Sequence, residues 1–277
     1  MARIRPFPGL RPLKEYADKV ASPPYDVLSS HEAREMAAGN PISFLHVNKP
    51  EIDLPPDTDP YAEVVYAKGR ENLQKLIKDG ILKSDDSPCY YVYAQTWGDH
   101  RQVGLVCGAS TMEYLEDKIR KHELTREEKE NDRIRHIEAL GAQVGPVFLT
   151  YHARDEINKE IAMIQEKEPT YDFTAADGIR HTLWVVSSKL RVEMITRLFE
   201  SVPVLYVADG HHRSASATII SQRRRKADPD CTGSEPWNYF LAVLFPHDQM
   251  KILPYNRVVQ QLNGMSSGEF TAEIEKK

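Results

Sequence analysis

The chain has 277 residues, a formal net charge of −5 and three cysteines. This length is enough for one large domain or two ordinary ones with a substantial buried core. The acidic balance argues against a general nucleic-acid binder, because phosphate contacts need a concentrated basic surface. The cysteines are far apart and odd in number, which indicates neither a zinc site nor a disulfide framework and favours a reducing, cytoplasmic location.

The two ends of the chain carry different signals. Residues 1–8 reach proline before the apolar core of a signal peptide could form, and no later run approaches the length of a membrane span. Residues 271–277 have the composition of a helix that has only begun, without a terminating signal. We therefore expect no membrane partner, and we expect the chain to stop inside a larger architecture.

Residues 1–115 predict an N-terminal α/β subdomain. A helix is expected over 31–38 with Ser30 as its cap, because good helix formers follow this serine. The other expected elements are a buried strand over 42–47, an amphipathic helix over 61–80, and a β-hairpin built from strands 90–97 and 102–109.

Residues 121–140 form the most charged segment, and their spacing predicts a helix with intrahelical ion pairs. A run of charges of this kind is typical of a solvated helix face. The apolar anchors Ile134, Ile137 and Leu140 all lie in the second half of the segment. The first half is therefore expected to border something polar rather than a core.

Residues 116–277 are expected to form a second domain in which helices and strands alternate without strict order. Because neither a Walker sequence nor G-x-G-x-x-G occurs, a nucleotide-binding domain here must be a mixed α/β fold other than a P-loop or Rossmann domain. The expected elements are strands over 144–151, 182–186 and 239–246 and helices over 156–167 and 192–199.

The strand over 239–246 is the most hydrophobic in the chain. Residues 252–255 follow it across a polar turn, so we expect the two segments to pair. This pairing would place Asn256 and Arg257 at a strand end, where they are candidates for substrate contact.

Residues 204–217 are the stretch around which the second domain is organised. A short apolar run ends on Asp209 and Gly210, and small residues follow, so the pattern predicts a strand, a tight turn and a helix. Gly210 can adopt backbone angles that are closed to other residues. Asp209 then lies at the carboxyl end of a strand, a usual place for a metal-binding or catalytic carboxylate, although a polar surface turn gives the same pattern. The side chains beside the positive end of the helix suit a nucleotide phosphate: His211, His212 and Arg213.

Several short segments together resemble a known family. They are spread over nearly the whole chain and include residues 22–27, 121–123, 132–133, 208–213 and 255–259. In these segments the chain resembles the family called domain of unknown function ten-fifteen.

The Asp-Gly-His-His-Arg element also resembles the phosphate loop of the ParB and sulfiredoxin superfamily, whose members bind ATP or CTP on a small mixed sheet. In that superfamily, kinases of free L-serine combine a His-Glu at the start of a helix with a downstream Asp-Gly-His-His-Arg. This chain has both elements, as His122-Glu123 and residues 209–213, although a longer stretch separates them here.

The resemblance implies an α/β (mixed α+β) fold with a ParB/sulfiredoxin-like sheet over residues 116–277. It implies that Glu123 is a general base and that Asp209 works with Mg²⁺ at the reacting phosphate. The phosphate oxygens would be held by Gly210, His211, His212 and Arg213, and the acceptor would contact His122 and Arg133.

The leading hypothesis is therefore a cytoplasmic, Mg²⁺-dependent kinase that phosphorylates the hydroxyl of free L-serine or a similar small acceptor, with ATP or ADP as donor. Such a reaction needs a carboxylate to accept the hydroxyl proton and oriented donors for the phosphate. One alternative is a nucleotide-binding switch that hydrolyses or senses CTP or ATP. Another is a sulfiredoxin-like repair enzyme, although no cysteine lies beside the phosphate loop to act as its nucleophile. No nucleic-acid partner is expected, and the acceptor, the donor and the oligomeric state stay open.

Overall fold

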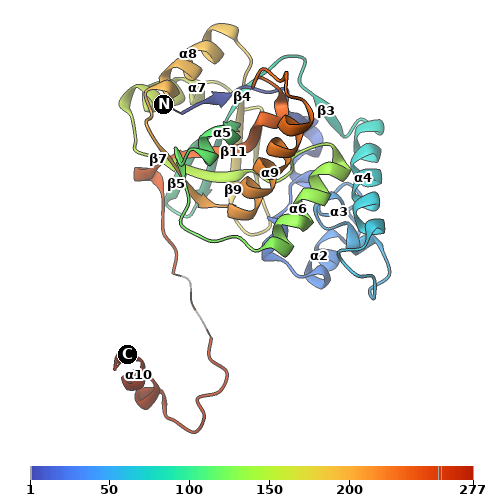
Figure 1. Ribbon diagram of the computed structural model, residues 1–277, viewed down its shortest axis with the longest axis vertical. Helices are drawn as coiled ribbons and strands as arrows, with labels where there is room; N and C mark the ends of the chain where they lie inside the picture. Colours follow the sequence, from blue (N-terminus) through green and yellow to red (C-terminus); the bar gives the residue numbers. More distant parts are fainter. Residues whose placement is uncertain (1, 255, 257, 277) are drawn as a thin grey trace.

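The computed structural model describes residues 2–254, 256 and 258–276. Most of them form one body around a mixed β-sheet, and the chain after residue 250 runs away from this body before a last short helix (Figure 1). The fold is mixed α/β, as the sequence predicts. Among the described residues, no helix is both long and apolar enough to cross a bilayer.

The central sheet has nine strands in the described part of the chain. Their order is β6-β10-β7-β11-β5-β4-β9-β8, and β1 pairs with β5 outside this path. The pairs β6–β10 and β7–β11 are parallel, and the other described pairs are antiparallel. The strands are β1 (Ile4–Arg5), β4 (Tyr90–Trp97), β5 (His100–Ser110), β6 (Ile119–Arg120), β7 (Val147–Tyr151), β8 (Tyr171–Thr174), β9 (Arg180–Val186), β10 (Leu205–Asp209) and β11 (Tyr239–Pro246). A separate small sheet pairs β2 (Leu10–Pro12) with β3 (Leu82–Ser84).

The helices surround this sheet, and α2, α3 and α4 gather at one side of the molecule next to α6 (Figure 1). They are α1 (Ala17–Val20), α2 (Ser30–Ala37), α3 (Leu45–Asn48), α4 (Glu63–Lys78), α5 (Thr111–Leu115), α6 (Glu127–Leu140), α7 (Asp155–Gln165), α8 (Lys189–Glu200), α9 (His211–Ala227) and α10 (Ser267–Glu275), with 3-10 turns η1 (Lys14–Tyr16), η2 (Tyr25–Val27), η3 (Pro50–Asp53), η4 (Pro236–Asn238) and η5 (His247–Gln249).

Strands from both sides of residue 115 share the sheet. β5 pairs with β11 from Ser110 opposite Tyr239 to Leu105 opposite Leu244. A continuous apolar core runs along these strands, and a smaller cluster lies among α1, α3, α4 and β3. The division into domains 1–115 and 116–277 stays a prediction.

The helix α9 packs closely between the sheet and α6. Its buried face carries small residues, with Ser214 and Ser216 fully buried and Ala217 4% exposed. Small side chains allow close backbone approach, and the Ser216 hydroxyl donates a hydrogen bond to the Glu130 carbonyl of α6 at 3.1 Å. The first turn of α9 is thereby fixed relative to the charged segment before and within α6.

Three sequence-based expectations for local structure are wrong. Residues 42–47 contain the start of helix α3 instead of a strand, because a short apolar run fits a buried helical turn as well as a strand. Residues 121–126 precede α6 rather than belong to it, and Leu124, which is 98% exposed, gives them no apolar anchor. Residues 252–254 form no strand, because β5 and β7 already occupy both edges of β11, and Tyr255 lies outside the described residues.

Other expectations are confirmed. The hairpin of β4 and β5 forms with Trp97 opposite His100, and the strand, turn and helix around Gly210 are present. The helix α2 also forms, with Ser29 rather than Ser30 as its cap: the Ser29 hydroxyl accepts from the Glu32 amide, and the Glu32 carboxylate accepts from the Ser29 amide.

Candidate functional site

The turn between β10 and α9 presents the start of a helix. Gly210 has φ 92° and ψ 32°, which lies in the left-handed region that favours glycine. A Cβ atom at this position would lie 3.3 Å from the Cα of Val147 in β7. Because glycine has no side chain, it also leaves the first amides of α9 without a side-chain cap. Such amides and the positive end of the helix suit an anion.

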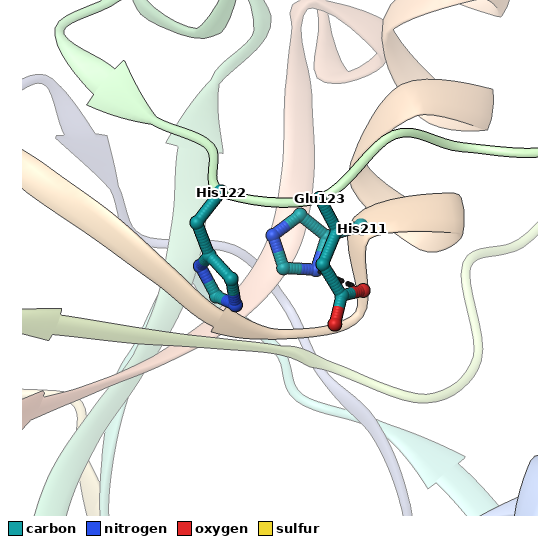
Figure 2. A group of neighbouring side chains, drawn as sticks. All are labelled: His122, Glu123 and His211. Carbon is teal, nitrogen blue, oxygen red and sulfur yellow. Dashed lines mark ion pairs between the residues drawn. The ribbon is translucent and has the colours of Figure 1, made fainter. Parts of the chain in front are cut away.

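The parallel pairing of β6 with β10 brings a second segment to this turn. Ile119 lies opposite Leu205 and Arg120 opposite Tyr206, so both chains leave the sheet at the same end. The residues after β6 are His122 and Glu123, and Figure 2 shows them reaching toward His211 at the start of α9. Two elements that are far apart in the sequence therefore meet, as the resemblance implies.

The contacts within this group are close. The Glu123 Oε2 atom lies 3.2 Å from Nδ1 of His211, and the rings of His122 and His211 meet edge to face with centroids 4.4 Å apart. The side chain of Glu123 is 61% exposed, whereas that of His211 is 3% exposed. The carboxylate of Glu123 is therefore accessible to a small molecule, and the imidazole of His211 is buried next to it.

The imidazole of His211 is buried next to a carboxylate. Burial lowers its pKa, and the nearby carboxylate of Glu123 opposes that shift only partly. The Nε2 atom is buried and has no hydrogen-bond partner among the described residues. The next side chain, His212, differs, because its Nε2 accepts a hydrogen bond from the Arg126 amide at 3.2 Å.

The two terminal nitrogens of the Arg213 guanidinium contact protein groups, whereas its buried Nε has no hydrogen-bond partner among the described residues. Its Nη2 atom lies 2.6 Å from Oδ2 of Asp209 and 3.5 Å from Oδ2 of Asp26, and Nη1 donates to the Pro146 carbonyl. The Arg213 side chain is 12% exposed. One oxygen of Asp209, the residue expected to work with Mg²⁺, is thus engaged by an arginine, although its side chain remains 71% exposed.

The N-terminal part of the chain completes this side of the site. The η2 turn brings Asp26 to Arg213, and the Arg133 guanidinium lies over the Tyr25 ring at 3.9 Å. Arg133 also forms an ion pair with Asp132 at 2.7 Å, and both side chains are 12% exposed. Arg133, a predicted substrate contact, is therefore largely used inside the protein. The roles of Tyr25 and Asp26 were missed, although both lie in a segment that carries the family resemblance.

Of the two remaining candidates, the structure describes only Asn256. Asn256 is exposed and lies outside the helices and strands. Arg257 lies outside the described residues.

A small cavity lies next to Arg213. It is lined by Arg133, His136, Gly145 and Arg213 among others and has a volume of about 20 Å³. This is room for about one water molecule. This cavity is therefore too small for a nucleotide.

The comparisons with known proteins place the chain in a family. No curated protein and no solved structure gives a significant match. One family model matches residues 4–277, which is nearly the whole chain. The chain belongs to the family described as "Protein of unknown function (DUF1015)".

Proposed function

We propose that the protein is a nucleotide-dependent small-molecule kinase that phosphorylates the hydroxyl of free L-serine or a similar small acceptor, with ATP or ADP as donor and Mg²⁺. The observation that supports this most is the approach of Glu123 to the first turn of α9, with Oε2 3.2 Å from Nδ1 of His211. A proton acceptor and a set of free amides then face the same space, as phosphoryl transfer requires.

In this reaction the acceptor oxygen attacks the terminal phosphorus of the nucleotide. A new P–O bond forms, the bond to the remaining nucleotide breaks, and the nucleotide leaves as ADP or AMP. The hydroxyl proton passes to the carboxylate of Glu123. The amides of His211, His212 and Arg213 bind the phosphate oxygens, where the helix end favours negative charge.

Within this proposal the exposed carboxylate of Asp209 would hold Mg²⁺. The Oδ2 atom of Asp209 contacts Arg213, which leaves Oδ1 as the oxygen for the cation. The side chain of Asp209 is 71% exposed, so this oxygen can be reached from solvent. The cation would neutralise charge at the reacting phosphate.

The test is phosphorus NMR with Mg²⁺, each of ATP, ADP and CTP in turn, and a pool of free hydroxyl amino acids. We expect a new phosphomonoester signal that depends on one acceptor. Glu123→Gln should reduce its rate by at least about 100-fold, which is the lower range for a general base, while nucleotide binding is retained. Glu127→Gln is the matched control, because Glu127 is an exposed carboxylate at the start of α6.

Two outcomes would contradict the proposal. If Glu123→Gln turned over as fast as the parent chain, Glu123 would not be the general base. Nucleotide-induced shifts without transfer to any acceptor would favour the alternative, a nucleotide-binding switch that senses or slowly hydrolyses CTP or ATP.

A further inference from the structure

The group formed by His122, Glu123 and His211 has the composition of a metal site. One ring nitrogen of each histidine and one oxygen of Glu123 lie within 4.8 Å of one another. Within the described part of the chain, no other set of three such side chains lies this close. The Glu123 Oε2 and His211 Nδ1 atoms are 3.2 Å apart. Two ligands of one tetrahedral zinc ion have nearly this separation, about 3.3 Å, at bond lengths of about 2.0–2.1 Å.

The donor types select the class of cation. Mg²⁺ prefers oxygen ligands and keeps several waters, whereas imidazole nitrogen suits Zn²⁺, Co²⁺ and similar ions. Two imidazoles with one carboxylate form the three-ligand set of open zinc sites, in which a water takes the fourth position. The exposure of His122 and Glu123 leaves such a position accessible from solvent.

We propose that His122, Glu123 and His211 bind a divalent transition-metal ion of the Zn²⁺ class through two imidazole nitrogens and one carboxylate oxygen. This site is separate from the Mg²⁺ expected to accompany a nucleotide at Asp209. His211 Nδ1 and Glu123 Oε2 already have the spacing of two ligands, and the exposed ring of His122 closes on the ion as the third.

The surroundings of the His211 ring determine what an ion at Nδ1 would displace. The His211 ring is 3% exposed and Glu123 is the charged group that contacts it. Its Nε2 has no hydrogen-bond partner among the described residues. An ion at Nδ1 displaces the contact with Glu123 and leaves the ring proton on Nε2, and Glu123 becomes a ligand of the same ion.

The positive end of α9 opposes a cation at this place, and the nearby carboxylates offset it. Glu123 provides one negative charge directly, and the exposed carboxylate of Asp209 lies at the same turn. A carboxylate oxygen that binds a metal cannot accept a proton, and the charge of the ion makes the second oxygen a weaker base. Occupancy of the metal site therefore weakens Glu123 as a base.

The test is a titration of the metal-stripped full chain with Co²⁺, followed by visible absorption, and with Zn²⁺, followed by calorimetry. The chain carries Cys231→Ser, because Cys231 is partly exposed and thiolates bind these ions tightly. We expect one ion per chain, with the intense visible bands of Co²⁺ in a four- or five-coordinate site.

Three variants decide the assignment. His122→Ala and Glu123→Gln each remove one ligand at an exposed position, and each should weaken binding by at least about 10-fold. His31→Ala is the matched control, because His31 and Glu35 form an exposed pair with Nδ1 and Oε2 3.5 Å apart on α2. Its affinity should equal that of the parent chain.

The proposal is overturned if His122→Ala and Glu123→Gln bind as tightly as the control, or if no ion binds at stoichiometric concentration. Pale, octahedral-type Co²⁺ spectra that are unchanged in all variants would indicate adventitious surface binding and would also overturn it. No nucleotide or turnover enters these measurements. The metal site and the phosphotransfer reaction can therefore fail independently of one another.

Discussion

Replacing Gly210 with alanine tests the turn on which the candidate site depends. An alanine at φ 92° pays the steric penalty of the left-handed region, about 1–2 kcal/mol. Its Cβ would also lie 3.3 Å from the Cα of Val147 and 3.2 Å from Nε of Arg213. The arginine can shift, but the strand backbone of β7 cannot easily do so. Together, strain and crowding should lower the free energy of unfolding by about 2–4 kcal/mol.

Two further glycines separate these contributions. Gly141 has φ 67° and no atom within 4 Å of an added Cβ, so Gly141→Ala carries the backbone strain alone, about 1–2 kcal/mol. Gly268 has neither a positive φ nor a close neighbour and lies in helix α10, where alanine is favoured, so Gly268→Ala should cost no stability. The assay is urea unfolding of the four proteins followed by circular dichroism, with thermal melts as a second measurement. The Gly210 variant should melt about 5–10 °C below the parent chain.

The order of the three variants decides the outcome. If Gly210→Ala costs no more than Gly141→Ala, the crowding against Val147 is refuted. If it costs no more than Gly268→Ala, the left-handed turn itself is refuted, and with it the geometry that presents the first amides of α9.

Two more predictions concern buried groups near the site. Burial lowers the pKa of His136 from 6.5 to about 4, and the ring contacts the Val47 carbonyl through Nε2 at 3.0 Å. Protonation of His136 is therefore less favourable in the folded state than in the unfolded state. The free energy of unfolding keeps this contribution above about pH 6.5 and falls by up to about 3 kcal/mol as the pH drops toward 4. Urea unfolding at several pH values should show this loss in the parent chain but not in His136→Gln. An equal dependence of the unfolding free energy on pH in both proteins would contradict it. Tyr66 donates a 2.8 Å hydrogen bond to Asp132 and is 3% exposed. Tyr66→Phe removes this bond and should lower the free energy of unfolding by about 1.5–3 kcal/mol in the same assay. The control Tyr61→Phe removes only an exposed contact and should cost less than about 0.5 kcal/mol, so equal losses would refute the role of the buried bond.

The sequence predicts those parts of the site whose signals are local. The strand, glycine turn and small-residue helix around Gly210 depend on residues that are adjacent in the chain, and all three are present. The position of Glu123 is partly predicted: it meets the turn, but it lies in an irregular segment before α6 rather than at the start of a helix. The charged residues of this segment have helical spacing, which predicts a helix. However, Leu124 is 98% exposed, so the segment has no apolar side chain that packs a helix against the core.

The contacts of the N-terminal segment with the site could not be predicted from local pattern. Two prolines before Tyr25 indicate an extended backbone but do not show where it lies. In the structure Asp26 approaches Arg213 at 3.5 Å, and Arg133 stacks on Tyr25 at 3.9 Å. A basic side chain beside a phosphate loop suggests a substrate contact, yet here its charge is matched by Asp132 at 2.7 Å. The missing information is the long-range contacts: that Asp26 approaches Arg213 and that the Tyr25 ring lies under Arg133.

The meeting of Glu123 with His211 is determined by the core rather than by their own attraction. An exposed ion pair contributes about 1 kcal/mol or less, and Glu123 is 61% exposed. The strands that precede the two residues, β6 and β10, are instead fixed by the pairing of Ile119 with Leu205. These two side chains are 0% and 1% exposed. Burying two such side chains stabilises the pairing by about 3–6 kcal/mol, several times the strength of the charge pair. The carboxylate is therefore held at the start of α9 whether or not His211 is protonated, as a proton acceptor or a metal ligand requires.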